Sequence, residues 1–379
     1  MSEPIRVLHL IKTLSLGGAE TNLLNLALAF DPARVETHVG YSYGGEIEPR
    51  FRAAGVRLFK YADRQHKVKS PWSLVIAWRI ARYIRRERIS IVHTHNFNAH
   101  IWGLIAAKLA GVKLIEHVHD FRYTPTDELV RRHGFMSHYR FIRWFRHGAD
   151  RVVVLTDAHR DYVIREKLAD AAHVVKIPNG IPMTVPMSDR KATRRALGIA
   201  DSAFVVLTSA RMDPTKNIEL VVRVADAVAA AIPGAVFVVA GDGPYRDGYE
   251  ALAREYGVDD HVRFIGFHPD VDALLAAADV FLLPSFLELH SIAILEATRR
   301  GVPIVVSDEV GCNEDFVVDG ASGYLCDPFE DARWITVIAR LARDPTLRLR
   351  IGLAGQETCR RLFDIATTAR RLEALYRSL

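Results

Sequence analysis

Two glutamates stand on either side of the start of an apolar segment. Glu288 belongs to a loop-like run, and Glu296 stands in the run Ile292–Arg300, which begins as a largely apolar helix. A carboxylate inside such a helix is costly without a partner. If the helix begins near His290, Glu296 lies about 9 Å along it, an offset that suits two hydroxyl-bearing ends of one ligand. Exposed glutamates that bind nothing are the alternative.

The first turn of the same helix is a candidate phosphate site. The first N–H groups of a helix have no partner within it and lie at the positive end of its dipole, so they attract anions. Here those residues are His290, Ser291 and Ile292. Together with the two glutamates, this turn predicts a ligand that carries both phosphate and hydroxyl groups.

Charged and glycine-containing loops follow two strand-like runs upstream. Arg211 and Lys216 follow the run Phe204–Ser209, and Gly241 and Gly243 follow the next run. Arginine can hold a diphosphate as a planar fork and lysine as a point charge, while glycine lets the backbone approach a ligand closely. A solvated charged loop and an ordinary turn are the alternatives.

A glycine pair opens the first helical run of the chain. Gly17 and Gly18 stand where N–H groups can point at a ligand. Their spacing does not match the dinucleotide-binding fingerprint, and no acidic residue follows at the required distance, so dinucleotide binding is not supported. A tight turn is the alternative.

Histidine pairs end two successive strand-like runs. The pairs are His93 with His95 and His117 with His119. Residues two apart on a strand share a face. The histidines of each pair could therefore bind a metal, form hydrogen bonds to sugar hydroxyls or have a structural role. No further ligand except Asp120 stands at a convincing spacing, and we expect no metal.

Strand-like and helical runs alternate along the whole chain. The helical patterns include Glu20–Phe30, Ile101–Ala110, Ile218–Ala231 and Ile292–Arg300. The strand-like runs are Arg6–Ile11, Glu36–Tyr41, Ser90–His93, Lys113–His117, Arg151–Leu155, Phe204–Ser209, Val236–Ala240, Val262–Ile265, Val280–Pro284 and Ile304–Ser307. Continuous apolar strands separated by helices predict parallel sheets covered on both faces.

The length of the chain, 379 residues, predicts two domains rather than one core. The turn-rich run Lys176–Pro182 indicates a hinge near residue 177. We therefore expect an α/β protein with two facing, doubly wound, Rossmann-like domains. Ligands bind such sheets at the carboxyl ends of the strands, so the loops described above should line an interdomain cleft.

Composition excludes several classes of protein. Hydrophobic residues (49%) and charged residues (25%) are at globular levels, which excludes disordered and collagen-like chains. Three cysteines without a CxxC pair exclude a disulfide scaffold and suit a reducing compartment. The first apolar run is too short for a signal peptide, and no run reaches the roughly 18–20 apolar residues of a membrane-spanning helix. We expect a soluble cytoplasmic protein.

Positive charge is concentrated in the first half. Residues 1–175 carry 27 Lys and Arg against 17 Asp and Glu, and the remaining residues carry 23 against 28. Aromatic and apolar residues at helical spacing accompany the charge in the segments 64–88 and 122–151: Trp72, Ile76, Ile80 and Tyr83, and then Phe141, Trp144 and Phe145. Such faces either dock on an anionic membrane surface or fill the core. No nucleic-acid motif accompanies them, so we expect no nucleic acid.

In their order and spacing, these motifs resemble the retaining glycosyltransferases of family 4, which have the GT-B fold. The resemblance runs from Gly17 to beyond Gly323 and rests on His119, Asn179-Gly180, Arg211, Lys216, Gly241-Asp242-Gly243-Pro244, Glu288, Glu296, and the segments 310–314 and 319–323. It implies an N-terminal acceptor-binding domain, residues 1–176, onto which residues 364–379 cross back. Residues 177–363 would form the nucleotide-sugar-binding domain.

The resemblance also implies roles for the matching residues. Arg211 and Lys216 would hold the donor diphosphate and stabilise it as it leaves, Glu296 would bind the ribose and Glu288 the sugar hydroxyls. His119 would lie near the reacting centre. The family usually needs no metal or other cofactor and retains the anomeric configuration by front-face attack, which requires charge stabilisation on the departing phosphate. The expected donor-binding residues are Gly17, Gly18, Arg211, Lys216, Gly241, Glu288, His290, Ser291, Ile292 and Glu296, and the expected catalytic residues are His119, Glu288, Arg211 and Lys216.

The implied reaction moves a hexosyl or N-acetylhexosaminyl group from a UDP- or GDP-sugar to a glycan or lipid-linked acceptor, in surface polysaccharide or glycolipid synthesis. The enzyme would work in the cytoplasm, or peripherally on the inner face of the membrane. The run Glu288–Ser291 departs from the Glu-Gly-Phe-Gly that is common in the family, and the lost glycines narrow the room beside the sugar. A non-catalytic glycan- or membrane-binding protein and a nucleotide-sugar epimerase are the alternatives.

Overall fold

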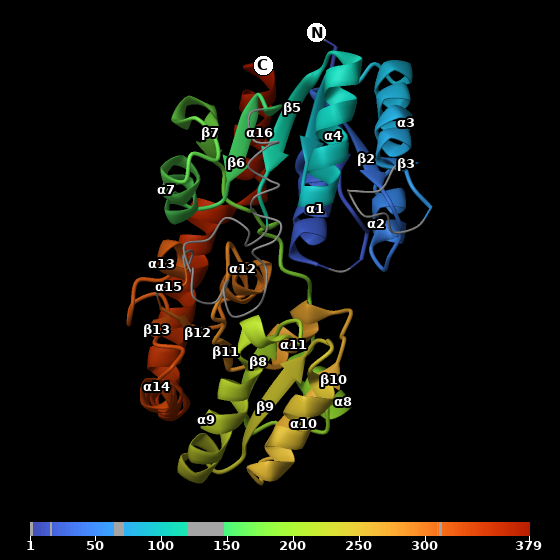
Figure 1. Cartoon of the computed structure of the whole chain (residues 1–379). Helices are drawn as coiled ribbons and strands as arrows, with labels where there is room; N and C mark the ends of the chain where they lie inside the picture. Colours follow the sequence, from blue (N-terminus) through green and yellow to red (C-terminus); the bar gives the residue numbers. More distant parts are fainter. Residues whose placement is uncertain (1–2, 16, 64–71, 120–147, 309, 311–312) are drawn as a thin grey trace. The chain divides into compact units, whose positions relative to one another are not determined.

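The computed structural model describes residues 3–15, 17–63, 72–119, 148–308, 310 and 313–379, and the chain forms two compact units (Figure 1). Unit 1 comprises residues 1–180 and 365–379, and unit 2 comprises residues 181–364. The sequence alone suggested a hinge near residue 177, whereas the division falls after Gly180. The final helix belongs with unit 1.

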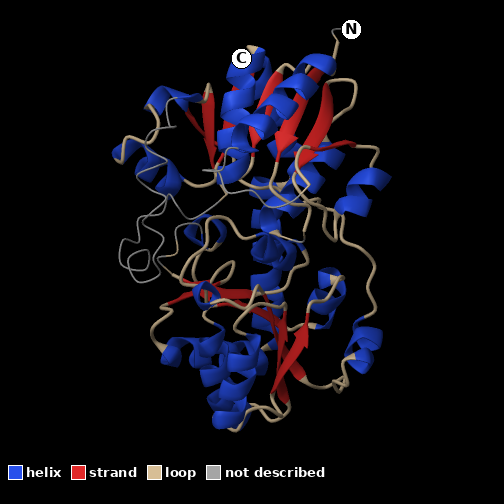
Figure 2. Ribbon diagram, turned by 45° about the vertical axis from the view of Figure 1, so that its right-hand side comes forward, coloured by secondary structure: helices blue, strands red, loops and turns tan. Residues whose placement is uncertain are grey.

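Unit 1 is a seven-stranded parallel sheet with helices on both faces (Figure 2). In sheet order the strands are β3 (Arg57–Lys60), β2 (Val35–Tyr41), β1 (Ile5–Leu10), β4 (Ile91–Thr94), β5 (Lys113–His117), β6 (Arg151–Val154) and β7 (Val174–Lys176). The helices are α1 (Gly18–Ala29), α2 (Glu48–Ala53), α3 (Trp72–Arg86), α4 (Phe97–Ala110), α7 (Asp157–Arg165) and α16 (Ile365–Arg377).

Strand alternation assigns the two faces of this sheet to different helices. Val7 on β1 packs with Leu26 of α1 and Leu372 of α16. Its neighbour Leu8 points to the opposite face and packs with Ile80 of α3 and with residues of α4. Because both faces are buried, the strands have the continuous apolar character that the sequence showed.

Unit 2 is a six-stranded parallel sheet, also covered on both faces. In sheet order the strands are β10 (Val262–Gly266), β9 (Ala235–Ala240), β8 (Phe204–Ser209), β11 (Val280–Leu283), β12 (Ile304–Ser307) and β13 (Tyr324–Cys326). The helices are α8 (Arg190–Ala196), α9 (Ile218–Ala231), α10 (Arg246–Glu255), α11 (Val271–Ala277), α12 (Ile292–Arg299), α13 (Asn313–Phe316), α14 (Asp331–Arg343) and α15 (Pro345–Phe363).

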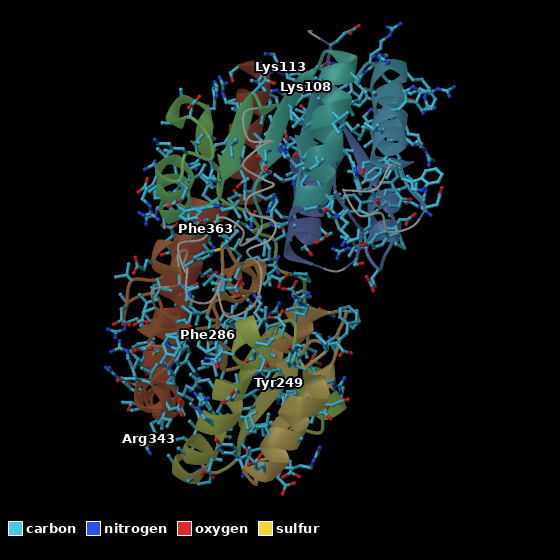
Figure 3. All side chains as sticks on the ribbon, in the orientation of Figure 1. Lys108, Lys113, Tyr249, Phe286, Arg343 and Phe363 are labelled. Atoms are coloured by element: carbon cyan, nitrogen blue, oxygen red, sulfur yellow. The ribbon has the colours of Figure 1, made fainter. Side chains whose placement is uncertain are left out.

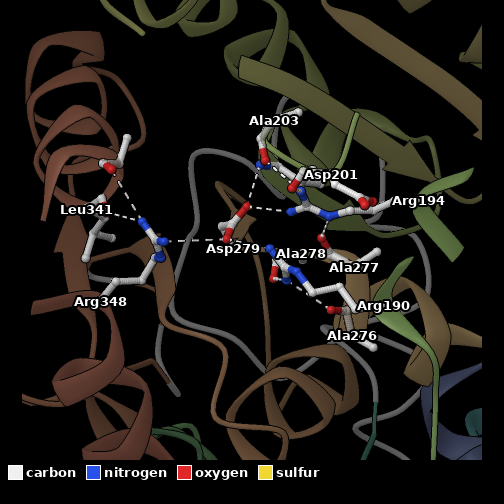
Figure 4. A network of polar contacts seen from close by, with 12 residues as sticks. Arg190, Arg194, Asp201, Ala203, Ala276, Ala277, Ala278, Asp279, Leu341 and Arg348 are labelled. Atoms are coloured by element: carbon white, nitrogen blue, oxygen red, sulfur yellow. Dashed lines mark hydrogen bonds and ion pairs between the residues drawn. The ribbon is translucent and has the colours of Figure 1, made fainter. Parts of the chain in front are cut away.

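A buried ionic network stabilises the amino-terminal end of the unit 2 sheet (Figure 4). Asp279, just before β11, accepts hydrogen bonds from Arg190 and Arg194 of α8, both at 2.8 Å, and from the Val205 N–H at 2.9 Å. Arg348 of α15 lies 3.7 Å from the same carboxylate. Burial lowers the pKa of Arg194. The network joins α8 and α15 to the sheet at the end opposite the ligand-binding loops.

Every strand predicted from the sequence is present to within one residue at each end. Strands β3, β7 and β13, which are only three or four residues long, lie outside the predicted runs. Helix starts were less accurate, because α4 begins at Phe97, after the N-cap Asn96, and not at Ile101. None of the described helices is both long and apolar enough to cross a lipid bilayer.

The aromatic face predicted on residues 72–83 is mostly a core face. Ile76, Ile80 and Tyr83 are buried against α4 and the sheet, whereas Trp72 is 52% exposed. The membrane interpretation of that set was therefore wrong for these three residues. The second predicted set, Phe141, Trp144 and Phe145, lies outside the described residues.

Candidate functional site

The loop after β8 is organised around Asp213. Its carboxylate accepts hydrogen bonds from the N–H and the hydroxyl of Thr215 and pairs with Arg211, whose Nη2 lies 2.7 Å away. Burial alone would raise the pKa of Asp213, but the hydrogen bonds from Thr215 and Arg211 lower it below its usual value. The Arg211 side chain remains 75% exposed, so it is held on one side by Asp213 and is accessible to an anion.

An ion pair joins this loop to the loop before α12. Lys216 Nζ lies 2.6 Å from Glu288 Oε1, and Ser285 Oγ donates to the same oxygen at 3.0 Å. The N–H of Phe286 (labelled in Figure 3) donates to the Thr215 carbonyl at 2.9 Å, which fixes the two loops to each other. The structure therefore brings together two residues that are 72 positions apart in sequence and that were both predicted to bind the donor.

The glycines after β9 allow two backbone segments to touch. Gly241 has a φ of +130°, and a Cβ atom there would lie 1.9 Å from the Ala210 carbonyl oxygen. A Cβ at Gly243 would lie 2.4 Å from the Met212 carbonyl oxygen, and the Met212 N–H donates to Asp242 at 2.9 Å. Because these two glycines have no Cβ atom, their loop can pack directly against the loop that carries Arg211. They therefore position the site indirectly.

Helix α12 begins at Ile292, the first residue of the predicted helical run Ile292–Arg300, and two residues after His290, where the first turn was expected. Ser291 is its N-cap, and its hydroxyl accepts from the Ile294 N–H at 3.5 Å. The N–H of Leu295 donates to the Ser291 carbonyl at 3.3 Å, and the N–H groups of Ile292 and Ala293 precede this intrahelical bond. The helix starts at Ile292 instead of near His290, which places the half-buried Glu296 about 6 Å along it.

The side chain of His290 belongs to the core of unit 2. It is 5% exposed, and its ring lies 4.6 Å from that of Phe316 and 5.1 Å from that of Phe363. Little of the imidazole surface is accessible to a ligand. In the alignment with Glu-Gly-Phe-Gly, His290 stands at the phenylalanine position, and it makes an aromatic packing contact where the sequence suggested a contact with the donor.

In unit 1 the glycine pair stands at the start of α1. Gly17 is the N-cap and Gly18 is the first residue of the helix. A Cβ at Gly17 would lie 2.4 Å from Glu20 Oε2, so the glycine makes room for a carboxylate in the first turn. Burial raises the pKa of Glu20.

Five histidines gather at the carboxyl end of the unit 1 sheet, on the face covered by α1 and α16. His9 Nδ1 lies 2.8 Å from His95 Nε2, and His95 Nδ1 lies 3.1 Å from His119 Nε2. The rings of His93 and His117 stack across neighbouring strands at 5.3 Å. His9 was not predicted from the sequence, although its position two residues after the buried Val7 of β1 was the signal that could have revealed it.

Burial keeps four of these imidazoles neutral. Desolvation lowers the pKa of His9 to about 3 and holds those of His93, His95 and His117 well below their usual value. Neutral imidazoles can donate at one nitrogen and accept at the other, which suits hydroxyl groups. His119 is the half-buried member of the set and so is the one nearest to solvent.

Comparison with known proteins agrees with this arrangement. The "Glycosyl transferase 4-like domain" family matches residues 17–180, and "Glycosyl transferases group 1" matches residues 189–358. The chain is 29% identical over 295 residues to the UDP-Gal:alpha-D-GlcNAc-diphosphoundecaprenol alpha-1,3-galactosyltransferase of Escherichia coli, which covers 74% of this chain and 73% of that protein. It is 27% identical to the alpha-D-kanosaminyltransferase of Streptomyces kanamyceticus over 81% of this chain and 82% of the relative.

The fold also has close counterparts among solved structures. The crystal structure of Anabaena Alr3699/HepE in complex with UDP-glucose superimposes with a TM-score of 0.85 at 22% identity, over 99% of this chain and 100% of that one. The two family matches, the relatives and the fold exclude the epimerase and the non-catalytic alternatives. The chain belongs to the family 4 type of GT-B glycosyltransferases, enzymes that take a hexosyl group from a nucleotide-sugar.

Proposed function

We propose that this enzyme transfers a sugar from a UDP-sugar to a lipid-linked acceptor with retention of configuration, in surface polysaccharide or glycolipid synthesis. The Escherichia coli relative is named for a UDP-galactose donor and a diphosphoundecaprenol-linked acceptor, and the Anabaena structure holds UDP-glucose. A GDP-sugar is the alternative donor, with guanine in place of uracil as the base. We further propose that unit 2 binds the donor and unit 1 the acceptor.

The Lys216–Glu288 pair is the observation that carries the donor half of the proposal. Two opposite charges, 16% and 9% exposed, are held 2.6 Å apart, and Lys216 belongs to the same loop as Arg211. When a diphosphate binds, Lys216 Nζ can turn to it, which frees the Glu288 oxygens to accept from sugar hydroxyls. The free enzyme therefore keeps both groups in place without leaving either charge unpaired.

The proposed chemistry needs positive charge at the departing phosphate. The bond between the anomeric carbon and the phosphate oxygen breaks while the acceptor oxygen attacks the same face, and the acceptor proton passes to the departing phosphate. Arg211 and Lys216 stabilise the charge that develops on the diphosphate, as do the first N–H groups of α12. Glu296 binds the ribose, and His119 lies at the sugar. No metal takes part in this scheme.

The acceptor half rests on an exposed apolar strip of α3. Trp72, Leu74, Val75 and Trp78 are 45–68% exposed, and the Arg82 guanidinium lies 5.8 Å from the centre of the Trp78 ring. Arg79, Arg82, Arg85 and Arg86 stand on the same helix. Exposed tryptophans beside arginines suit the interface of an anionic membrane. We therefore propose peripheral docking of unit 1 on the cytoplasmic face of the membrane, where a lipid-linked acceptor is found.

Transfer is tested with a panel of UDP- and GDP-sugars and an undecaprenyl-diphosphate-linked N-acetylglucosamine acceptor. We expect acceptor-dependent release of UDP, and an α-linked product by proton coupling at the new anomeric centre when the donor is an α-linked UDP-sugar. A β-linked product would refute retention. Equal release of nucleotide with and without acceptor would refute transfer.

Docking is tested by co-sedimentation with phosphatidylglycerol vesicles. The double variant Trp72→Ser/Trp78→Ser should lose most binding, because the exposed indole surface is removed, and binding by the unaltered enzyme should weaken with salt. Tyr245→Ser/Tyr256→Ser on unit 2, whose side chains are 51% and 46% exposed, is the matched control and should bind normally. Equal binding by both double variants would refute the assignment to α3.

A further inference from the structure

The histidine cluster of unit 1 contains more nitrogen atoms than its hydrogen bonds use. Within the described part of the chain, both ring nitrogens of His117 are buried without a hydrogen-bond partner. A buried polar atom without a hydrogen-bond partner destabilises the folded protein. A group that binds to these atoms would remove this destabilisation, and a neutral imidazole nitrogen is either a hydrogen-bonding atom or a metal ligand.

Three of the histidines have the arrangement of metal ligands. One nitrogen each from His95, His117 and His119 lie within 4.8 Å of one another. His95 Nδ1 and His119 Nε2 are 3.1 Å apart, close to the roughly 3.3–3.4 Å that separates two nitrogens bound tetrahedrally to zinc at about 2.0–2.1 Å. The ring centre of His95 lies 5.3 Å from the ring centre of His119 and 5.4 Å from the ring centre of His117.

We propose that His95, His117 and His119 form a binding site for one divalent transition-metal ion of the zinc type. Three neutral imidazoles with a fourth position open to water are an accepted zinc environment, and imidazole ligands also suit cobalt, nickel and copper. The set contains no carboxylate, which disfavours magnesium and calcium.

A neighbouring histidine completes the site. If His95 binds the ion through Nδ1, its Nε2–H donates to His9 Nδ1 at 2.8 Å. Such a bond to the far nitrogen fixes the tautomer and the ring orientation of a ligand histidine. Entry of the ion is through His119, because that residue is half-buried whereas His95 and His117 are at most 1% exposed.

A second group of three, His9, His93 and His95, also meets the distance condition. All three side chains are 0% exposed, and His93 Nδ1 lies 2.8 Å from the Tyr376 hydroxyl. An ion would have no accessible ligand through which to enter. We therefore assign the site to the group that contains His119.

The transfer reaction proposed above does not use this ion. Resting on that proposed function, we expect the ion to inhibit the enzyme, because it would occupy His119 beside the sugar. Inhibition by Zn²⁺ that a chelator reverses is the expected result. Zn²⁺ binding without inhibition would count against the role of His119 in transfer and would leave the metal site standing.

The decisive experiment measures the ion itself. The full chain, without a histidine tag and freed of metal by chelator and dialysis, is titrated with Co²⁺ and then Zn²⁺ by calorimetry and visible spectroscopy. We expect one ion per chain, with the visible bands of four-coordinate cobalt, and displacement by zinc. X-ray absorption of the zinc form should show three imidazole ligands. No stoichiometric binding, or fewer than three imidazoles, would overturn the proposal.

Variants locate the ion. His117→Gln and His119→Gln should each weaken Co²⁺ binding at least tenfold, and His9→Gln should weaken it about 10- to 100-fold through the orientation of His95. His93→Gln and the exposed His173→Gln are the controls and should bind as the unaltered chain does. Loss of binding in His93→Gln with normal binding in His117→Gln would place the ion in the other group and refute the assignment. Melting curves of each variant show whether it is folded, and the absorption measurement on the unaltered chain is independent of them.

Discussion

The Lys216–Glu288 pair can be tested by removing its two charges separately and together. Lys216→Met keeps an unbranched side chain without the ammonium group. Glu288→Gln keeps the shape of the side chain and an oxygen that can accept from Ser285. The double variant has neither charge. The three proteins form a double-mutant cycle, which measures the interaction between the two positions apart from their separate contributions.

The structure sets the expected size of the effect. The two atoms are 2.6 Å apart, and the side chains are 16% and 9% exposed. Removing one partner of a fully buried pair costs about 3–5 kcal/mol, and the partial exposure of Lys216 reduces that to about 2–4 kcal/mol for each single variant. The double variant leaves no unpaired charge, so it should lie within about 1 kcal/mol of the unaltered protein. The coupling energy should then be at least about 3 kcal/mol.

Stability and donor affinity should respond differently in this cycle. Stability is measured by denaturant unfolding of the full chain, and hydrogen exchange shows which part of the unfolding belongs to unit 2. Donor affinity is measured by calorimetry with the UDP-sugar. A hydrogen bond to a charged group is worth about 1.5–3 kcal/mol, so all three variants should bind the donor about 10- to 150-fold more weakly. The double variant should therefore recover stability without recovering affinity.

Two results would refute this reasoning. If the double variant is destabilised by the sum of the single effects, the two side chains do not form the pair. If it binds the donor as the unaltered enzyme does, the pair is structural and the donor site lies elsewhere.

The remaining predictions concern positions that support the two units. Asp279→Asn should lower the stability of unit 2 by about 3–5 kcal/mol in denaturant unfolding, because the buried Arg194 side chain, 1% exposed, loses its carboxylate partner. The control is Glu357→Gln, at an exposed ion pair, which should change the stability by less than about 0.5 kcal/mol in the same assay. Equal effects of the two variants would contradict the role of the network. Gly241→Ala should raise the KM for the donor, because the left-handed φ and the nearby Ala210 carbonyl oppose a Cβ atom at a cost of about 1–3 kcal/mol. Gly248→Ala is the control and should leave the KM unchanged, because a Cβ atom there meets open space. A normal KM in Gly241→Ala would show that donor binding does not need this loop conformation. Burial lowers the pKa of His38, so the unfolded chain takes up a proton below about pH 6.5 that the folded chain does not. As the pH is lowered, this residue should contribute a loss of stability of up to about 1.4 kcal/mol per pH unit, in addition to the losses from the other buried histidines. His38→Gln should make this decline shallower in melting curves between pH 7 and 5, and an unchanged slope would contradict the assignment.

The sequence by itself determined the order and kind of the main elements. Continuous apolar runs, such as the one at β9, are strands because both faces of a parallel sheet are buried, and this pattern is local. The loops after strands could likewise be identified as the ligand-binding end, since parallel strands place their carboxyl ends together. The strands that were not predicted, β3, β7 and β13, have three or four residues, whereas buried four-residue strands such as β11 were predicted.

Only the tertiary structure decided which distant side chains meet. Lys216 and Glu288 are paired because their loops follow adjacent strands, β8 and β11, and no local pattern records that adjacency. His9 joins the other histidines for the same reason, since β1 lies beside β4. His290 and Trp72 show the converse, because residue type alone did not tell whether a ring would lie in the core or at the surface. The burial of a side chain depends on which residues pack against it, and those residues lie far away in the sequence.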